Sequence, residues 1–347
     1  MLNAKRFTSV FGVAIVLILA ARVAPSEQSK ADSGVVPPVQ SFALTDTSAL
    51  DLQGIKADVA QYRGRTAVRI TSDGPEAGLA WVKGTDFRDG TIEFDVATHI
   101  LAPPGVRMPG FTGIAFRARP QDQHFELFYL RPGNALSDDQ AMRNHSVQYT
   151  SEPAFGWEKL RRQWPMIYEA YADIHPDDWI KVKIEVRGRV ARLFLNGSSN
   201  ASLVVDGMKG EELHGPIGLW GYTGEESYFS NLRITNEKPE AVENGGDAAG
   251  TWNVVFNTDA GRFGGTLKLV RQGTTLVGLW SGALGPDQPV SGWWRDGYSE
   301  LSFSGTWPDQ PGAVTATMAG WVDGDAAHGR VKVEGRADGR WTATRSK

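Results

Sequence analysis

Apolar and polar residues alternate along much of the chain between residues 42 and 235, as expected for β-strands with one buried and one solvated face. In Ile180–Val186, Ile and Val alternate strictly with Lys and Glu. Short strands broken by Gly, Pro and Asp predict a β-sandwich here. Similar runs are Thr66–Thr71, Gly90–Val96, Gly113–Ala118, His124–Arg131 and Val190–Leu195.

One segment, residues 152–173, departs from this alternation. Its large apolar residues, among them Trp157, Leu160, Trp164 and Tyr168, follow a loosely helical spacing that Pro165 interrupts. Because proline removes a helical hydrogen bond, we expect an ordered excursion with a short helix that lies over the sandwich.

A second region, residues 250–347, carries eight short apolar runs joined by turn residues. Eight hairpin-linked strands can close into a small up-and-down β-barrel, which leaves no exposed edge. Residues 236–249 have few large apolar side chains and are predicted to be a linker. The expected turns are Gln272-Gly273, Asp296-Gly297, Asp323-Gly324 and Asp338-Gly339.

The N-terminus has the pattern of an export signal. A charged start precedes the apolar run Phe11–Ala21, which is shorter than the about 20 residues of a membrane span. Pro25 disfavours cleavage after Ala24, and Ser29–Ala31 offers a small-x-small site. Residues 1–31 are therefore predicted to be either a cleaved signal peptide or an uncleaved anchor. We expect residues 32–41 to be a flexible leader and the protein to be periplasmic or secreted, with membrane contact only through an uncleaved N-terminus.

Charge and cysteine content exclude several function classes. The net charge of −4 gives no basic footprint for nucleic acid. The absence of cysteine excludes disulfides, a lipoprotein anchor and Cys metal sites. The six histidines show no ligand spacing, so we expect no metal and no cofactor.

Six motifs follow one another in order between residues 87 and 234. They are Phe87–Asp95, Gly113–Arg117, Asp178–Ile184, Leu193–Gly197, Gly215–Trp220 and Tyr228–Ile234. Together they resemble the concanavalin A-like superfamily and, within it, the 3-keto-disaccharide hydrolase-like (laminin G-like) domains of exported bacterial proteins. That resemblance implies a jelly-roll sandwich over 42–235 and a carbohydrate ligand, but this fold carries lectins, adhesion modules and glycosidases alike.

The second region has Gly250–Trp252 at its start and Gly339–Ala343 at its end. With these residues it resembles, in fold alone, the small avidin-like or calycin-like β-barrel modules of exported bacterial proteins.

Two acidic residues are candidates for acid–base catalysis on one strand. Glu93 and Asp95 are expected on the same strand face, ~7 Å apart, which is a spacing that glycoside cleavage can use. The retaining glycosidases of the resembled fold have an E-x-D-x-x-E cluster, and the third acid is missing here. The alternative is that both acids belong to a solvated strand face.

A polar cluster is predicted on the concave face of the other central strands. Arg and Asn side chains can pair with sugar hydroxyls, Glu126 can exchange a proton, and Trp157 can stack on a sugar ring. The alternative is a structural cross-strand pair between Arg117 and Glu126. The cluster comprises Arg117, Glu126, Arg131, Asn134, Asn144, His145, Gln148 and Trp157.

The incomplete acid set favours binding over hydrolysis. We therefore expect an exported protein that binds glycans on the concave face of the sandwich. One alternative is a 3-keto-disaccharide (glycoside) hydrolase with Glu126, Glu93 or Asp95 as acid or base. The other is a non-enzymatic scaffold of the cell envelope.

Overall fold

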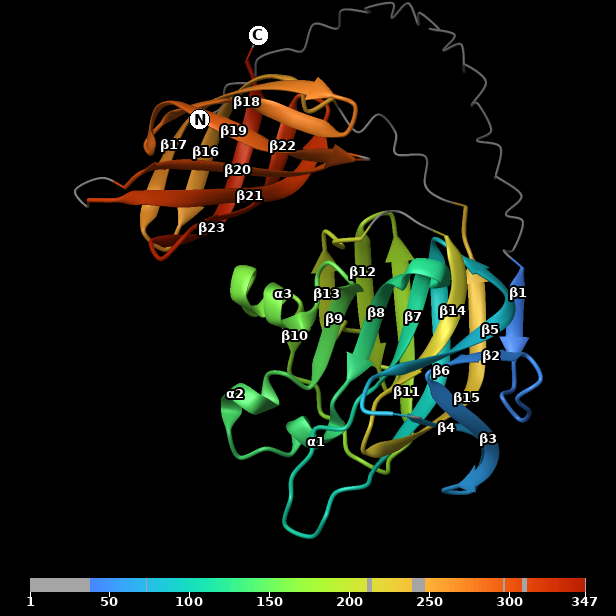
Figure 1. Cartoon of the computed structure of the whole chain (residues 1–347). Coiled ribbons are helices and arrows are strands. Elements are labelled where there is room, and N and C mark those ends of the chain that lie inside the picture. Colours follow the sequence, from blue (N-terminus) through green and yellow to red (C-terminus); the bar gives the residue numbers. More distant parts are fainter. Residues whose placement is uncertain are drawn as a thin grey trace, which may run out of the picture. The chain divides into compact units, whose positions relative to one another are not determined.

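The computed structural model describes residues 38–72, 74–210, 214–238, 247–295, 297–307 and 311–346. These residues form an all-β protein, with a jelly-roll-like sandwich followed by a closed barrel (Figure 1). The predicted export segment 1–31, residues 32–37 of the predicted leader and residues 239–246 of the predicted linker lie outside the described residues.

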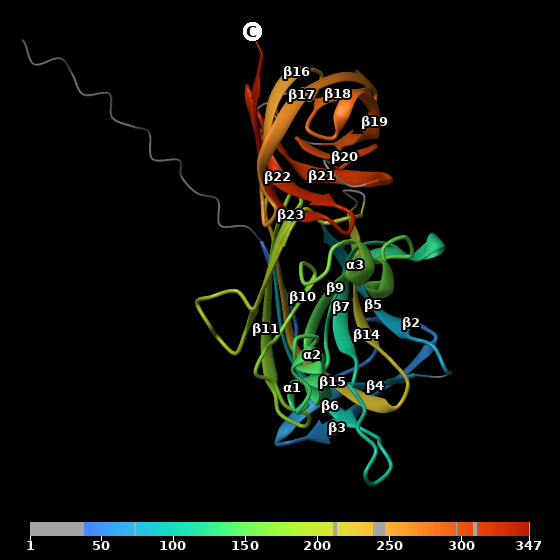
Figure 2. The same ribbon diagram turned by 90° about the vertical axis from the view of Figure 1, so that its left-hand side faces the viewer.

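The sandwich has two antiparallel sheets that stack face to face (Figure 2). We call the first the back sheet, because the groove described below lies on the other one. Its strand order is β13-β12-β11-β6-β15-β4-β3, with β1 beside β15. Its strands are β13 (Leu203–Asp206), β12 (Val190–Leu195), β11 (Ile180–Arg187), β6 (Gly90–Ile100), β15 (Glu225–Asn236), β4 (Arg65–Ser72), β3 (Ile55–Tyr62) and β1 (Val39–Phe42).

The front sheet has the order β10-β9-β8-β7-β14-β5-β2. Consecutive strands β7 and β8 are hairpin neighbours, whereas β14 comes from much later in the chain and pairs between β7 and β5. The strands are β10 (Glu169–Ala170), β9 (Val147–Glu152), β8 (His124–Leu130), β7 (Thr112–Arg119), β14 (Gly215–Gly221), β5 (Gly78–Phe87) and β2 (Leu50–Gln53).

The main core fills the space between the two sheets. Ile92, Phe94 and Ile184 from the back sheet are buried there with Phe116 and Phe128 from the front sheet. Because a strand alternates its faces, the apolar side chains of β6 and β11 point inward while their Glu and Lys residues point to solvent. Burying each large apolar side chain stabilises the fold by about 1.5–3 kcal/mol.

Two local features refine the expectations from sequence. Strand β1 begins at Val39, because Val39–Phe42 pair with Leu232–Thr235, so ordered structure starts within the predicted leader 32–41. The excursion over 152–173 contains the short helix α3 (Trp157–Gln163), which ends before Pro165. The other short helices are η1 (Pro120–Asp122), α1 (Pro132–Ala135) and α2 (Gln140–Arg143).

Eight sequential strands close the barrel, because β16 pairs with β23. Its core includes Trp280, whose ring stacks between Phe256 and Phe303 at centroid distances of 5.1 and 5.0 Å. The strands are β16 (Gly250–Thr258), β17 (Gly261–Gln272), β18 (Thr275–Gly282), β19 (Gly285–Arg295), β20 (Tyr298–Thr306), β21 (Ala313–Asp323), β22 (Ala326–Val333) and β23 (Ala337–Arg345).

One predicted turn is wrong. Asp338-Gly339 lies inside β23, and the turn before it is formed instead around Gly335, which has a φ of 65°. At Gly339 a Cβ would lie 2.2 Å from the Asn257 carbonyl oxygen, so the glycine permits close approach of two strands. Within the described residues, no helix is long and apolar enough to cross a membrane.

Candidate functional site

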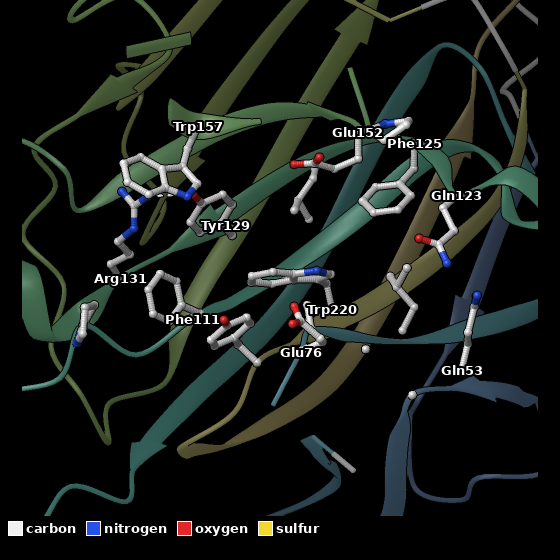
Figure 3. A pocket seen from close by; sticks show the side chains of 18 of the residues that line it. Gln53, Glu76, Phe111, Gln123, Phe125, Tyr129, Arg131, Glu152, Trp157 and Trp220 are labelled. Carbon is white, nitrogen blue, oxygen red and sulfur yellow. Dashed lines mark hydrogen bonds between the residues drawn. The ribbon is translucent and has the colours of Figure 1, made fainter. Parts of the chain in front are cut away.

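A groove of about 800 Å³ lies on the outer face of the front sheet, the face turned away from the back sheet. Figure 3 shows Trp157, Arg131 and Phe111 on one side of the groove, Gln53 and Gln123 on the other, and Glu152 between them. Further lining residues are Glu76, Leu79, Trp81, Phe125, Leu127, Tyr129, Asn134, His145, Arg161, Trp220 and Tyr222.

Strand β8 explains why the groove is apolar. Phe128 and Leu130 face the core between the sheets, so the alternate residues Phe125, Leu127 and Tyr129 face outward. Both faces of this strand are therefore apolar, unlike those of β11. An outward apolar face on a sheet marks a surface that something covers or binds.

Aromatic rings form a connected floor along the groove. The Tyr129 and Trp220 centroids are 5.2 Å apart, and Trp81 meets Phe125 edge-on at 6.2 Å. Phe111 lies 6.1 Å from Tyr129. Flat aromatic faces of this kind pack well against the apolar faces of sugar rings.

Arg131 closes one side of the floor. Its Nη2 donates to the Tyr129 hydroxyl at 2.6 Å, and its Nη1 donates to the His145 carbonyl at 2.9 Å. Gln148 Oε1 accepts from both nitrogens at 3.3 Å. Since Tyr129 accepts from Arg131, its own O–H proton is left to donate elsewhere. Burial raises the Tyr129 pKa to about 12, so the phenol keeps that proton at neutral pH.

Asn134 and His145 lie next to Arg131 in the same wall. Asn134 Nδ2 donates to the His145 carbonyl at 3.4 Å, and His145 Nδ1 lies 2.9 Å from Glu169 Oε2. Burial lowers the pKa of His145, which favours the neutral imidazole. A neutral imidazole can both donate and accept hydrogen bonds, as sugar hydroxyls require.

Trp157 stands at the entrance of the groove and is 42% exposed. It begins α3, one turn before Arg161, whose guanidinium lies 4.7 Å from the Trp157 ring centre. Arg161 is held in turn by Glu169, to which it donates at 2.7 Å. The Arg161 guanidinium therefore holds the exposed Trp157 indole in place through a cation–π contact.

Glu152 is the carboxylate in the middle of the groove, at the end of β9 (Figure 3). Among the described residues it forms no ion pair, and burial raises its pKa above the usual range of glutamate. Glu76, the other carboxylate that lines the groove, is exposed. A carboxyl group that changes its charge closer to neutral pH is suited to proton transfer.

The structure brings four of the predicted ligand-binding residues, Arg131, Asn134, His145 and Trp157, together in the groove. Gln148 lies behind them and contacts Arg131. Asn144 follows α2 and accepts a hydrogen bond from Gln140 at 2.7 Å, so it does not line the groove.

Arg117 and Glu126 also lie outside the groove. A bulge in β7 gives Arg117 a φ of 49°, and its buried guanidinium donates to Asp89 at 2.8 Å. Glu126 points to the interior and accepts from the Tyr149 hydroxyl at 2.5 Å. Burial raises the Glu126 pKa more strongly than the Arg117 charge lowers it. These two side chains are electrostatic neighbours within the sandwich, not parts of its open face.

Glu93 and Asp95 lie on the back sheet, away from the groove lining. Asp95 is buried and receives Arg65 and Asn231, each at 2.8 Å. Its two partners hold it in a polar network of the sheet. Glu93 is half-buried and Asp95 is buried, so the strand face that carries them is not fully solvated.

Sequence reasoning missed most of the aromatic floor and two charged residues. Trp81 and Trp220 come from strands far apart in the chain that only the sheet order makes close. The run His124–Arg131 did carry a signal, because its residues are apolar at both odd and even positions. A strand that is apolar on both faces has no solvated face, so an apolar outer face could have been predicted from the sequence. The missed residues are Trp81, Phe111, Phe125, Tyr129, Glu152, Arg161, Trp220 and Tyr222.

In the part of the chain that the structure describes, no three His, Asp or Glu side chains gather closely enough to hold a metal ion.

Residues 49–235 match the family of the 3-keto-alpha-glucoside-1,2-lyase-like domain, which is more than half of the chain. The chain belongs to this family. The match covers nearly all of the sandwich, so the groove is a feature of the lyase-like domain. No curated protein matches the chain in sequence.

Several solved structures are similar in fold to the lyase-like domain. The carbohydrate binding module CBM66 from Bacillus subtilis is 16% identical, with a TM-score of 0.35, over 53% of this chain and 98% of that chain. A putative glycosyl hydrolase from Parabacteroides distasonis is 12% identical, with a TM-score of 0.35, over 57% and 94%. The Ca2+/Man3GlcNAc-bound VIP36 exoplasmic/lumenal domain is 12% identical, with a TM-score of 0.39, over 58% and 89%.

Proposed function

We propose that the lyase-like domain binds a carbohydrate in the groove on the outer face of the front sheet. The observation that carries this is the combination of a connected aromatic floor with a wall of hydrogen-bonding groups. The floor, with Tyr129 and Trp220, suits the apolar face of a sugar, and Arg131, Asn134 and His145 suit its hydroxyls. The family match supports a glycoside-related ligand.

A glycan array that includes methyl 3-keto-α-glucoside tests this proposal on the chain from residue 32 onward. We expect binding that Trp220→Ala weakens by at least ~10-fold, because ring stacking is lost. Phe194→Ala on the back sheet is the matched control and should leave binding unchanged. Absence of any bound glycan would contradict the proposal.

A second candidate is cleavage of a 3-keto-α-glucoside, the substrate class in the family description. Glu152 favours it, since this carboxylate lines the groove, forms no ion pair among the described residues and has a raised pKa. In an elimination, Glu152 takes the proton from C2, the C1–C2 double bond forms, and the C1–O bond breaks. Protonated Glu152 returns this proton to the leaving oxygen, and the Tyr129 hydroxyl donates a hydrogen bond to the ketone oxygen as negative charge develops on it. This assigns acid–base work to Glu152 instead of Glu126, Glu93 or Asp95.

The remaining sequence-based alternatives concern location and partners. We propose that residues 1–31 direct export to the periplasm or beyond, with a tether if they remain uncleaved. N-terminal sequencing of the protein from fractionated cells tests this, and a cytoplasmic protein with an intact N-terminus would contradict it. The envelope-scaffold alternative is supported only if the protein is exported and the array finds no glycan.

A further inference from the structure

Glu225, the first residue of β15, is a deeply buried carboxyl group beside the groove. It is 2% exposed and follows a tight turn at Gly224, whose φ is 86°. Among the described residues it forms no ion pair, and its Oε2 has no hydrogen-bond partner. Because burying a carboxylate without a cation costs folding free energy, the surroundings of Glu225 favour its neutral form.

The Glu225 carboxyl joins two segments of backbone. Its Oε1 accepts from the Tyr222 amide at 3.2 Å, and the Phe111 amide also stabilises its ionised form. The carbonyl of Gly224, the residue before Glu225, accepts a hydrogen bond from the Leu101 amide at 2.9 Å. Residues 101–111 and 222–224 are therefore tied to each other at the start of β15.

Both residues whose amides meet the carboxyl carry rings of the groove. The Phe111 and Tyr222 centroids are 5.2 Å apart, and Tyr222 lies 6.3 Å from Trp220. Arg131 lies 5.7 Å from the Phe111 ring. The aromatic rim formed by Phe111 and Tyr222 thus depends on backbone that Glu225 fixes.

Burial raises the pKa of Glu225 to about 8, and the amides of Phe111 and Tyr222 act against this rise. The charged groups nearby contact other residues or are exposed to solvent. Glu226, the neighbour on the opposite strand face, pairs with Arg69, and Arg131 is bound by Tyr129, Gln148 and His145. His99, which is opposite Glu226 on β6, lies 2.8 Å from Asp177, and Arg107 in the 101–111 segment is exposed.

We propose that Glu225 is a positioning residue of the groove: its neutral carboxyl holds the backbone of Phe111 and Tyr222, and its ionisation loosens this rim. A neutral carboxyl tolerates the apolar surroundings, whereas a carboxylate needs water that only a loosened rim admits. The consequence for ligand affinity rests on the proposed function, but the consequence for the rim does not.

Hydrogen exchange of the full chain tests the rim directly. Peptides covering 101–112 and 220–226 are compared at about pH 6 and about pH 9, after correction for intrinsic exchange. We expect their protection to fall at least ~10-fold at the higher pH in the wild-type protein and to stay constant in Glu225→Gln. Peptides from β11 should not change. An equal pH response in both proteins, or none in the wild type, would overturn the proposal.

Glu226→Gln is the matched control, because it removes the next carboxyl along the strand without touching the rim. It should keep the wild-type pH response, and loss of that response would also overturn the proposal. If Glu225→Gln does not fold, the role of Glu225 is tested with the wild type, Glu226→Gln and Glu225→Ala. We expect Glu225→Ala to loosen the rim at both pH values.

The affinity for methyl 3-keto-α-glucoside separates the two proposals. We expect it to weaken by ~10-fold between about pH 7 and about pH 9 in the wild type and not in Glu225→Gln. A rim that loosens while affinity stays constant would overturn the link between Glu225 and the ligand. Failure of the probe to bind at any pH would count against the proposed function, and the exchange result would still decide the role of Glu225 in the rim.

Discussion

The guanidinium of Arg161 lies 4.7 Å from the ring centre of Trp157 and donates to the Glu169 carboxylate at 2.7 Å. This relationship keeps a half-exposed indole in one orientation at the entrance of the groove. A preoriented aromatic side chain costs less entropy on binding than a mobile one.

Truncation of Trp157 therefore tests its role as a sugar platform. We expect Trp157→Ala to weaken binding of methyl 3-keto-α-glucoside by ~10-fold, which corresponds to the about 1.4 kcal/mol of one stacked ring. Isothermal calorimetry measures it. Val204→Ala, which removes an exposed apolar side chain from the back sheet, should bind like the wild type. Equal affinities of all three proteins would remove Trp157 from the site.

Glu152→Gln separates binding from acid–base catalysis. If Glu152 acts as base, release of p-nitrophenol from p-nitrophenyl 3-keto-α-glucoside should fall at least ~100-fold, while affinity changes little. In the wild type, the rate should rise with pH through the pKa of Glu152, which burial places above the usual glutamate value. Glu158→Gln on the exposed side of α3 is the control. Full turnover by Glu152→Gln would exclude this carboxylate.

Glu126→Gln should leave turnover and binding unchanged but alter how stability depends on pH. Burial raises the Glu126 pKa, so the folded state binds its proton more tightly than the unfolded chain does. Wild-type stability therefore falls as pH rises above the ordinary glutamate pKa, and the neutral variant escapes this loss. Thermal unfolding should show Glu126→Gln gaining on the wild type as the pH rises above about 4. A constant difference between the two proteins would contradict this.

The buried pair of Arg117 and Asp89 gives a prediction for the sandwich alone. Asp89→Ala leaves a guanidinium that is 1% exposed without its partner and removes the acceptor of the Gly188 amide. We expect a loss of about 3–5 kcal/mol in the free energy of unfolding, measured with urea. Adding Arg117→Met should restore part of it, because the uncompensated charge is gone. A single variant as stable as the wild type would show that the pair is dispensable.

The sequence predicted the architecture well because the architecture follows from local patterns. Strict alternation in β6 and β11 specifies one buried face, and the hairpins of the barrel carry Gly at tight turns such as Gly273 and Gly324. The misplaced turn at Asp338-Gly339 has a physical reason. Glycine occurs both where a turn requires it and where two strands approach closely, and the local sequence does not distinguish the two cases.

The site was predictable only in part. Arg131, Asn134, His145 and Trp157 come from one stretch of chain, so their proximity could be inferred. Trp220 reaches the same groove through the pairing of β14 between β7 and β5, which local patterns do not encode. Arg117 was misplaced because one bulge in β7 redirects its side chain, and a bulge shifts every alternation rule after it.

Closure of the barrel by β16 and β23 has a practical consequence. Trp252 and Arg345 are cross-strand partners, so the chain enters and leaves this fold at neighbouring points. A module with adjacent ends can be spliced into a surface loop of a host protein with short joints, and its own ends can be reconnected elsewhere by circular permutation.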